Sequence, residues 1–216
     1  MKWPLTACLT LAAVIAGFGW GVGTVRYGIF PYSILAGAKN PQLTARRDYF
    51  RAYSGHADIV VFGDSILRSV EWAEELPGRT VLNRAIENDT SADALARVDD
   101  IAKVNAAEYV ILLGANDLMR GEPAETTARN VQRIVDQLPG DKLILGVMAC
   151  AGCEADEIAR LNTLLGRTKG ARFAAVAIEP VDLVDGTHLG AVGMNKLAET
   201  VRQHIHPQNA NSLAAM

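Results

Sequence analysis

Short runs of apolar, largely β-branched residues recur along the chain after its first quarter. They cover residues 59–62, 80–82, 109–113, 143–147 and 173–178. Continuous apolar runs of this length are typical of strands that are buried on both faces of a parallel sheet. The pattern therefore predicts five parallel strands.

The stretches between these runs carry apolar residues at helical spacing. They cover 91–104, 123–138, 154–165 and 191–205. Thr90 or Ser91 is suited to cap the first of them, and Pro123 stands near the start of the second. Strands and helices in alternation predict an α/β fold, a right-handed three-layer sandwich with functional residues beyond the carboxyl ends of its strands.

The first segment has a different pattern. No charged residue occurs between Lys2 and Arg26. A run of roughly 20 apolar residues can span a bilayer, whereas the apolar core of a secretory signal is usually about 7–15 residues long. We expect residues 1–26 to form an apolar membrane-anchoring helix. A cleaved signal and a buried helix of a soluble protein are the alternatives.

The charges around this run do not favour export. Lys2 precedes it, and Arg26, Lys39, Arg46 and Arg47 follow it, so the positive-inside count mildly opposes translocation. We still expect a membrane-anchored or secreted protein with an extracytoplasmic, periplasmic domain, because a single N-terminal span most often acts as an export signal.

The rest of the chain divides at changes of composition. Residues 27–55 contain Pro31 and Pro41 and have no sustained period, which predicts a linker, with a short amphipathic helix over 46–53. We expect the folded domain at 56–206 and a loose tail at 207–216.

Composition excludes some functions. The chain has 216 residues, of which 50% are hydrophobic and 21% charged, with a net charge of −3. This is ordinary for a folded domain, and it provides no large basic field for nucleic acid. No cluster of metal ligands and no phosphate-binding loop is present, so neither a metal nor an organic cofactor is implied. The sequence does not indicate an oligomeric state.

Two motifs at predicted strand ends provide a nucleophile and a base. Gly-Asp-Ser, ending at Ser65, follows the first strand, and Asp185 stands three residues before His188 after the fifth. A carboxylate at this spacing can bind Nδ1–H and leave Nε2 free to take the proton of a serine. Taken alone, Ser65 also suits a helix cap, and His188 also suits a surface loop.

Two further loops follow strands at the same edge. Asn116 lies in Gly-Ala-Asn-Asp after the third strand, and its amide could stabilise an oxyanion, an effect worth about 3 kcal/mol. The loop 83–90 after the second strand could supply a backbone N–H. An Asx-turn and an ordinary connection are the alternatives for these loops.

Together these motifs resemble the SGNH/GDSL hydrolases over roughly residues 58–204. Ser65 matches the serine block of this family, Asn116 its asparagine block, and Asp185 with His188 its last block. The resemblance implies a flavodoxin-like three-layer α/β/α sandwich with a five-stranded parallel sheet. It also implies catalytic residues Ser65, Asp185 and His188, with an oxyanion hole formed by Ser65, Asn88 and Asn116.

The second block departs from the family pattern. Ala85 and Asn88 stand where glycines are usual, and Asn88 aligns with the oxyanion glycine. Any residue except proline keeps the backbone N–H, and asparagine is the least costly substitute where φ is positive. We therefore expect a working but altered oxyanion hole.

The expected activity is that of a serine esterase that forms an acyl-Ser65 intermediate. Its substrates would be O-acetyl groups on glycans, or lipid or thioester substrates. An acyltransferase acting on a cell-envelope glycan and a catalytically impaired binding module with the same fold are the alternatives.

Cys150 and Cys153 follow the fourth strand and are separated by two residues. A redox Cys-x-x-Cys and a small local disulfide in an exported protein both fit this spacing, and we favour the disulfide.

Overall fold

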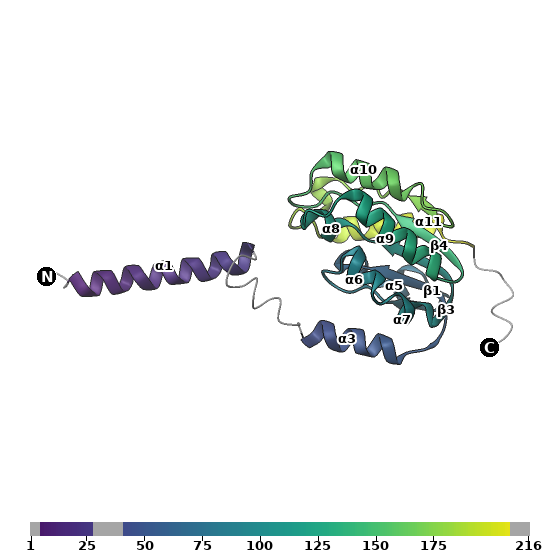
Figure 1. The fold of residues 1–216 in the computed structure, drawn as a ribbon, viewed down its shortest axis with the longest axis horizontal. Helices are drawn as coiled ribbons and strands as arrows, with labels where there is room; N and C mark the ends of the chain where they lie inside the picture. Colours follow the sequence, from purple (N-terminus) through teal and green to yellow (C-terminus); the bar gives the residue numbers. More distant parts are fainter. Residues whose placement is uncertain (1–4, 28–40, 208–216) are drawn as a thin grey trace. The chain divides into compact units, whose positions relative to one another are not determined.

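The computed structural model describes residues 5–27 and 41–207. The chain divides into two compact units, Met1–Arg46 and Arg47–Met216. The helix α1 (Leu5–Tyr27) lies in the first unit (Figure 1).

The apolar N-terminal segment is helical as expected, but its predicted role as a membrane anchor is not supported. Within residues 5–27 and 41–207, no helix combines the length and the apolarity needed to cross a membrane. Gly17, Gly19 and Gly21 contribute no side chain to the surface of α1. Residues 28–40 of the predicted linker and residues 208–216 of the predicted tail lie outside the described residues.

The second unit contains the predicted parallel sheet. Its strands are β1 (Gly55–Gly63), β2 (Val81–Asn83), β3 (Val104–Leu112), β4 (Asp141–Leu145) and β5 (Arg172–Ala174). All neighbouring pairs are parallel, and the order is β2-β1-β3-β4-β5. Because this order reverses direction between β1 and β3, the residues after these two strands flank a topological switch point.

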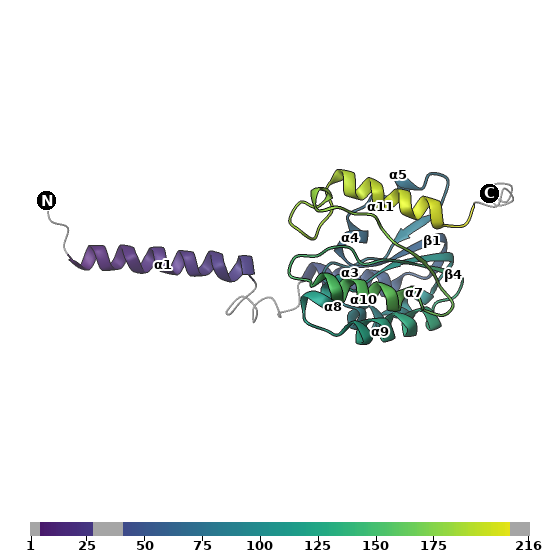
Figure 2. The same ribbon diagram turned by 90° about the horizontal axis from the view of Figure 1, so that it is seen from above.

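Helices cover both faces of the sheet (Figure 2). One face packs against α4 (Ser65–Arg68), α5 (Trp72–Glu75) and α11 (Ala191–His204) through a core that includes Leu67, Trp72 and Leu197. The other face packs against α6 (Ser91–Leu95), α7 (Val98–Ala102), α9 (Ala124–Gln137) and α10 (Ala155–Leu165). The remaining described helices are α3 (Pro41–Ala52), α8 (Ala115–Met119) and the 3₁₀ turn η1 (Pro180–Asp182).

Several predicted bounds differ from the structure, including those of β1 and β3, which begin earlier than predicted. The helix expected over 91–104 is broken between α6 and α7, where Arg97 leaves helical geometry at φ −122° and its guanidinium binds the buried Asp89 carboxylate. The fifth strand ends at Ala174 instead of 178, because its neighbour β4 ends opposite it at Leu145. The short helix expected over 46–53 begins earlier, at Pro41.

Candidate active site

Ser65 lies at the carboxyl end of β1 and begins α4. A Cβ on Gly63 would come within 2.3 Å of the Leu112 carbonyl oxygen, so glycine lets β1 end close against β3. Asp64 caps α4 by accepting a hydrogen bond from the Ile66 N–H at 3.0 Å. These two residues fix the turn that carries the Ser65 hydroxyl.

The side chains of Ser65, His188 and Asp185 lie in hydrogen-bond contact. Ser65 Oγ is 3.1 Å from His188 Nε2, and His188 Nδ1 is 2.7 Å from Asp185 Oδ2. The second carboxylate oxygen, Oδ1, accepts the backbone N–H groups of Thr187 and His188 at 3.0 and 2.8 Å. The His188 N–H first, and the imidazole second, lower the pKa of Asp185 to about 2. Asp185 is thus an ionised hydrogen-bond acceptor at neutral pH.

The loop that carries Asp185 and His188 is closed by its own backbone. Leu183 and Leu189 form an antiparallel bridge, and the Val184 N–H donates to the His188 carbonyl oxygen at 2.9 Å. The buried Asp182 at the base of this loop binds Lys196 Nζ of α11 at 2.6 Å. These contacts constrain the backbone of the loop and thereby the position of the His188 imidazole.

Asn116 lies in the first turn of α8, directly after β3. Gly114 precedes it at φ +132°, a backbone conformation that favours glycine, and a Cβ there would lie 2.7 Å from Leu161 Cδ2. Asn116 Nδ2 donates to the Asp89 carbonyl oxygen at 3.0 Å and contacts Asp64 Oδ2 at 3.4 Å. Asn116 is buried beside Asp64 and the loop that follows β2.

Asn88 has a left-handed backbone, with φ +62°, and it is the one non-glycine residue with positive φ in the described part of the chain. This is the conformation for which asparagine was expected to replace glycine at the lowest cost. Arg120 Nη2 donates to the Asn88 carbonyl oxygen at 2.9 Å. The loop therefore keeps a glycine-like shape at Asn88.

Asp64 is deeply buried, which was not predicted from its motif. Its exposed fraction is 1%. Burial raises the pKa of Asp64 to about 7, against the lowering effect of the Ile66 N–H. A buried carboxyl group with a pKa near neutrality therefore lies one residue from Ser65.

Cys150 and Cys153 form a disulfide in the turn after β4. Between them, the Ala151 N–H donates to Thr187 Oγ1 at 2.9 Å. This contact was not predicted, because it joins two loops that lie 36 residues apart in sequence. The disulfide-closed turn thus contacts the loop that carries His188.

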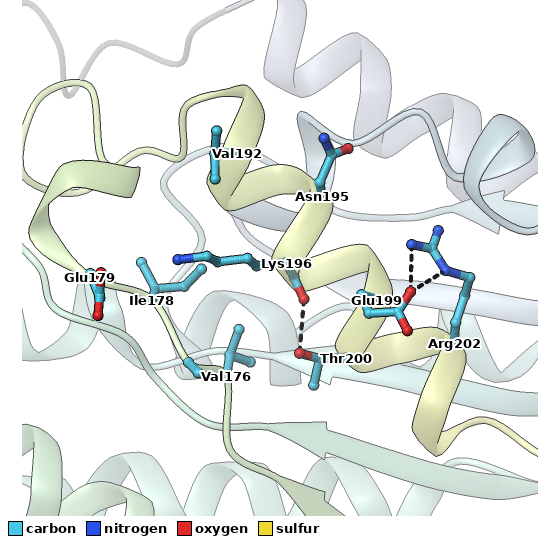
Figure 3. Close-up of a pocket in the computed structure, with 10 residues that line it drawn as sticks. Val176, Ile178, Glu179, Val192, Asn195, Lys196, Glu199, Thr200 and Arg202 are labelled. Atoms are coloured by element: carbon cyan, nitrogen blue, oxygen red, sulfur yellow. Dashed lines mark hydrogen bonds and ion pairs between the residues drawn. The ribbon is translucent and has the colours of Figure 1, made fainter.

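A cavity of about 810 Å³ lies elsewhere, between α11 and the segment that follows β5 (Figure 3). Val176, Ile178 and Val192 form its apolar wall, and no residue of the Ser65–His188–Asp185 set lines it. As for metals, the described residues contain no group of three or more His, Cys, Asp or Glu side chains that could hold an ion.

Known proteins share this architecture. A protein from Streptococcus pneumoniae described as a platelet activating factor has a TM-score of 0.70 at 16% identity, over 87% of this chain and 99% of its own. AlinE4, an SGNH-hydrolase family esterase, has a TM-score of 0.51 at 21% identity, over 76% and 98%. The esterase EstA from Pseudoalteromonas sp. has a TM-score of 0.54 at 15% identity, over 67% and 96%. At these identities the likeness establishes the fold.

The family assignment comes from the sequence itself. Among curated proteins, none matches this chain significantly. The model of the GDSL-like lipase/acylhydrolase family matches residues 61–210, which include Ser65, Asn88, Asn116, Asp185 and His188. The chain therefore belongs to the GDSL-like lipase/acylhydrolase family, as an SGNH/GDSL-type hydrolase of ester bonds.

Proposed function

We propose that the protein hydrolyses carboxylic esters through an acyl enzyme on Ser65. Ser65 Oγ attacks the ester carbonyl while His188 Nε2 takes its proton. The tetrahedral intermediate expels the alcohol, which receives this proton from His188. Water then attacks the acyl-serine with His188 again as base, and the acid and free Ser65 are released.

The observation that carries this proposal is the 3.1 Å separation of Ser65 Oγ and His188 Nε2. The 2.7 Å contact of Nδ1 with the ionised Asp185 supports it, because this contact favours the tautomer with a free Nε2. The same contact stabilises the imidazolium that forms during attack.

We assign the oxyanion hole to the backbone N–H groups of Ser65 and Asn88 and to Asn116 Nδ2. The left-handed backbone of Asn88 supports its assignment. One amide hydrogen of Asn116 is held by the Asp89 carbonyl oxygen at 3.0 Å. The contact of Nδ2 with Asp64 Oδ2 is long, at 3.4 Å, and leaves the second amide hydrogen available to the oxyanion.

We further propose an ester with a short acyl group on a bulky alcohol, such as an O-acetyl group on a glycan. The His188 and Asp185 side chains are 48% and 55% exposed, which supports a site that is open to a large alcohol. A series of p-nitrophenyl esters of increasing acyl length separates this proposal from a long-chain lipid substrate. Turnover of p-nitrophenyl acetate and butyrate should exceed that of the decanoate; preference for the decanoate would contradict the short acyl group.

A fluorophosphonate probe tests the nucleophile directly. Peptide mass spectrometry should locate the label on Ser65, and no label should appear in Ser65→Ala. An inert wild type would instead favour the binding module, and a label on another serine would exclude this site. If the unlabelled wild type transfers acetyl groups to sugar hydroxyls faster than to water, it is an acyltransferase.

We also propose that the domain works in an oxidising, extracytoplasmic compartment. The Cys150–Cys153 disulfide supports this location, since such bonds are rare in the reducing cytoplasm. Alkylation of the denatured, unreduced protein from its native host should modify Cys8 and leave Cys150 and Cys153 unmodified. Alkylation of all three cysteines would contradict it.

A further inference from the structure

The loop 84–89 carries Asn88 and ends at a buried carboxylate. The Asp89 side chain is 0% exposed and binds two guanidinium groups. Arg97 Nε donates to Oδ2 and Arg47 Nη2 donates to Oδ1, both at 2.7 Å. Because a buried charge is costly unless it is paired, we expect the position of Asp89 to depend on both arginines.

The two arginines come from different parts of the chain. Arg97 precedes α7, within the segment that the family model matches, and it also donates from Nη1 to the Arg84 carbonyl oxygen at 2.9 Å. Arg47 lies on α3, which ends at Ala52, before the matched segment begins at residue 61. One of the two arginines that pair with Asp89 therefore lies outside the segment that the family model matches.

The same helix also contacts the beginning of the loop. The buried Arg84 guanidinium lies over the Phe50 ring at 4.6 Å and over the Tyr53 ring at 4.8 Å. Cation–π contacts of this kind are stronger when water is excluded. Residues on and directly after α3 thus hold Arg84 at one end of the loop and Asp89 at the other.

We propose that Arg47 is a positioning residue for the oxyanion hole, acting through Asp89 on the neighbouring N–H of Asn88. The inference rests on the proposed esterase function. The backbone transmits the effect, since Asp89 is bonded directly to Asn88 and its carbonyl oxygen also holds Asn116 Nδ2 at 3.0 Å. Loss of Arg47 leaves Asp89 Oδ1 buried without its charged partner and loosens both assigned donors.

Arg47→Gln in the full chain tests this, with Arg51→Gln as the matched control. Arg51 is on the same helix, is 65% exposed and binds Asp48 and Asp100 instead of the loop. We expect Arg47→Gln to lower kcat by roughly tenfold to a hundredfold with little change in KM, because small displacements of catalytic groups have effects of this size. Arg51→Gln should keep wild-type kcat.

Two further measurements separate positioning from a structural role. Arg47→Lys keeps the charge and should recover part of the lost kcat, and it carries the test if Arg47→Gln does not fold. Binding of phenylboronic acid, which forms a tetrahedral adduct with a serine, should weaken in parallel with kcat/KM. Binding of 4-nitroacetanilide, the amide analogue of p-nitrophenyl acetate, should not weaken.

The outcomes distinguish this inference from the proposed function. If the wild type shows no Ser65-dependent ester turnover, the proposed function fails and the inference fails with it. If Ser65-dependent turnover is present and folded Arg47→Gln matches Arg51→Gln in kcat and boronate binding, only the inference is wrong. If Arg47→Gln does not fold, the same result for folded Arg47→Lys has this meaning.

Discussion

The backbone N–H of Ala151 donates to Thr187 Oγ1 at 2.9 Å, which joins the turn closed by the disulfide to the loop carrying His188. Thr187 also donates its own N–H to Asp185 Oδ1 at 3.0 Å. The cysteine pair therefore lies two hydrogen bonds from the carboxylate that orients the imidazole.

Replacing both Cys150 and Cys153 with serine should lower stability and, more modestly, activity. The closed loop is very short, so the chain-entropy contribution of this disulfide is about 2 kcal/mol. We expect a lower melting temperature and a few-fold loss of kcat, measured beside Cys8→Ser as the control. Unchanged kcat and stability would show that the turn does not support the His188 loop.

Asn88 should tolerate glycine better than alanine. Its φ of +62° is open to glycine without strain, whereas alanine pays roughly 1–2 kcal/mol in this region. Asn88→Gly should keep kcat near wild type, and Asn88→Ala should be less stable and slower. Denaturant unfolding and ester turnover measure both effects. Equal behaviour of the two variants would contradict a requirement for left-handed backbone at this position.

Asp185→Asn should reduce kcat by roughly two to four orders of magnitude, because the amide no longer favours the tautomer with a free Nε2. The pKa of Asp185 is lowered to about 2, so its carboxylate stays ionised as the pH falls from 7 through its ordinary value of 3.8. The contribution of the Asp185 carboxylate to catalysis is lost only as the pH approaches 2. A pH–rate profile whose acid limb near pH 4 disappears in Asp185→Asn would contradict this.

Asp64 should make the protein less stable as the pH rises. The folded pKa of about 7 lies above the ordinary 3.8, so the folded state binds this proton more tightly than the unfolded chain does. The contribution of this proton to the free energy of unfolding is complete below pH 4. It is lost as the pH rises toward 7, by an amount on the order of a few kcal/mol.

Urea unfolding of Asp64→Asn at several pH values checks this, with the exposed Asp99→Asn as the control. The Asp64 variant should lose less stability between pH 4 and pH 7 than the wild type does, whereas Asp99→Asn should follow the wild type. Parallel curves for all three proteins would show that Asp64 does not hold a proton as described.

Local patterns predicted the sheet, because strands buried on both faces produce continuous apolar runs that need no knowledge of their partners. The order of motifs then placed Ser65, Asn116 and His188 at one edge, where the structure brings them together with Asp64 and Asp89. The strand ends and the motifs after them were accessible from sequence for this reason.

Contacts between distant segments could not be predicted from the sequence. The break between α6 and α7 coincides with the Arg97–Asp89 ion pair. The spacing of apolar residues at 91–104 does not reveal this ion pair. Arg47 gave no signal either, because it lies in a segment expected to be a linker and its partner is 42 residues away. The same limit applies to Asp64, whose motif revealed a turn but not its burial.

The central claim is that Ser65 is the nucleophile of an ester hydrolase. Its most direct test is turnover of p-nitrophenyl acetate by Ser65→Ala, measured beside Ser54→Ala, an exposed serine just before β1. The predicted result is wild-type turnover in Ser54→Ala and no turnover above background in Ser65→Ala, with both variants folded. Retention of wild-type activity in folded Ser65→Ala would contradict the account.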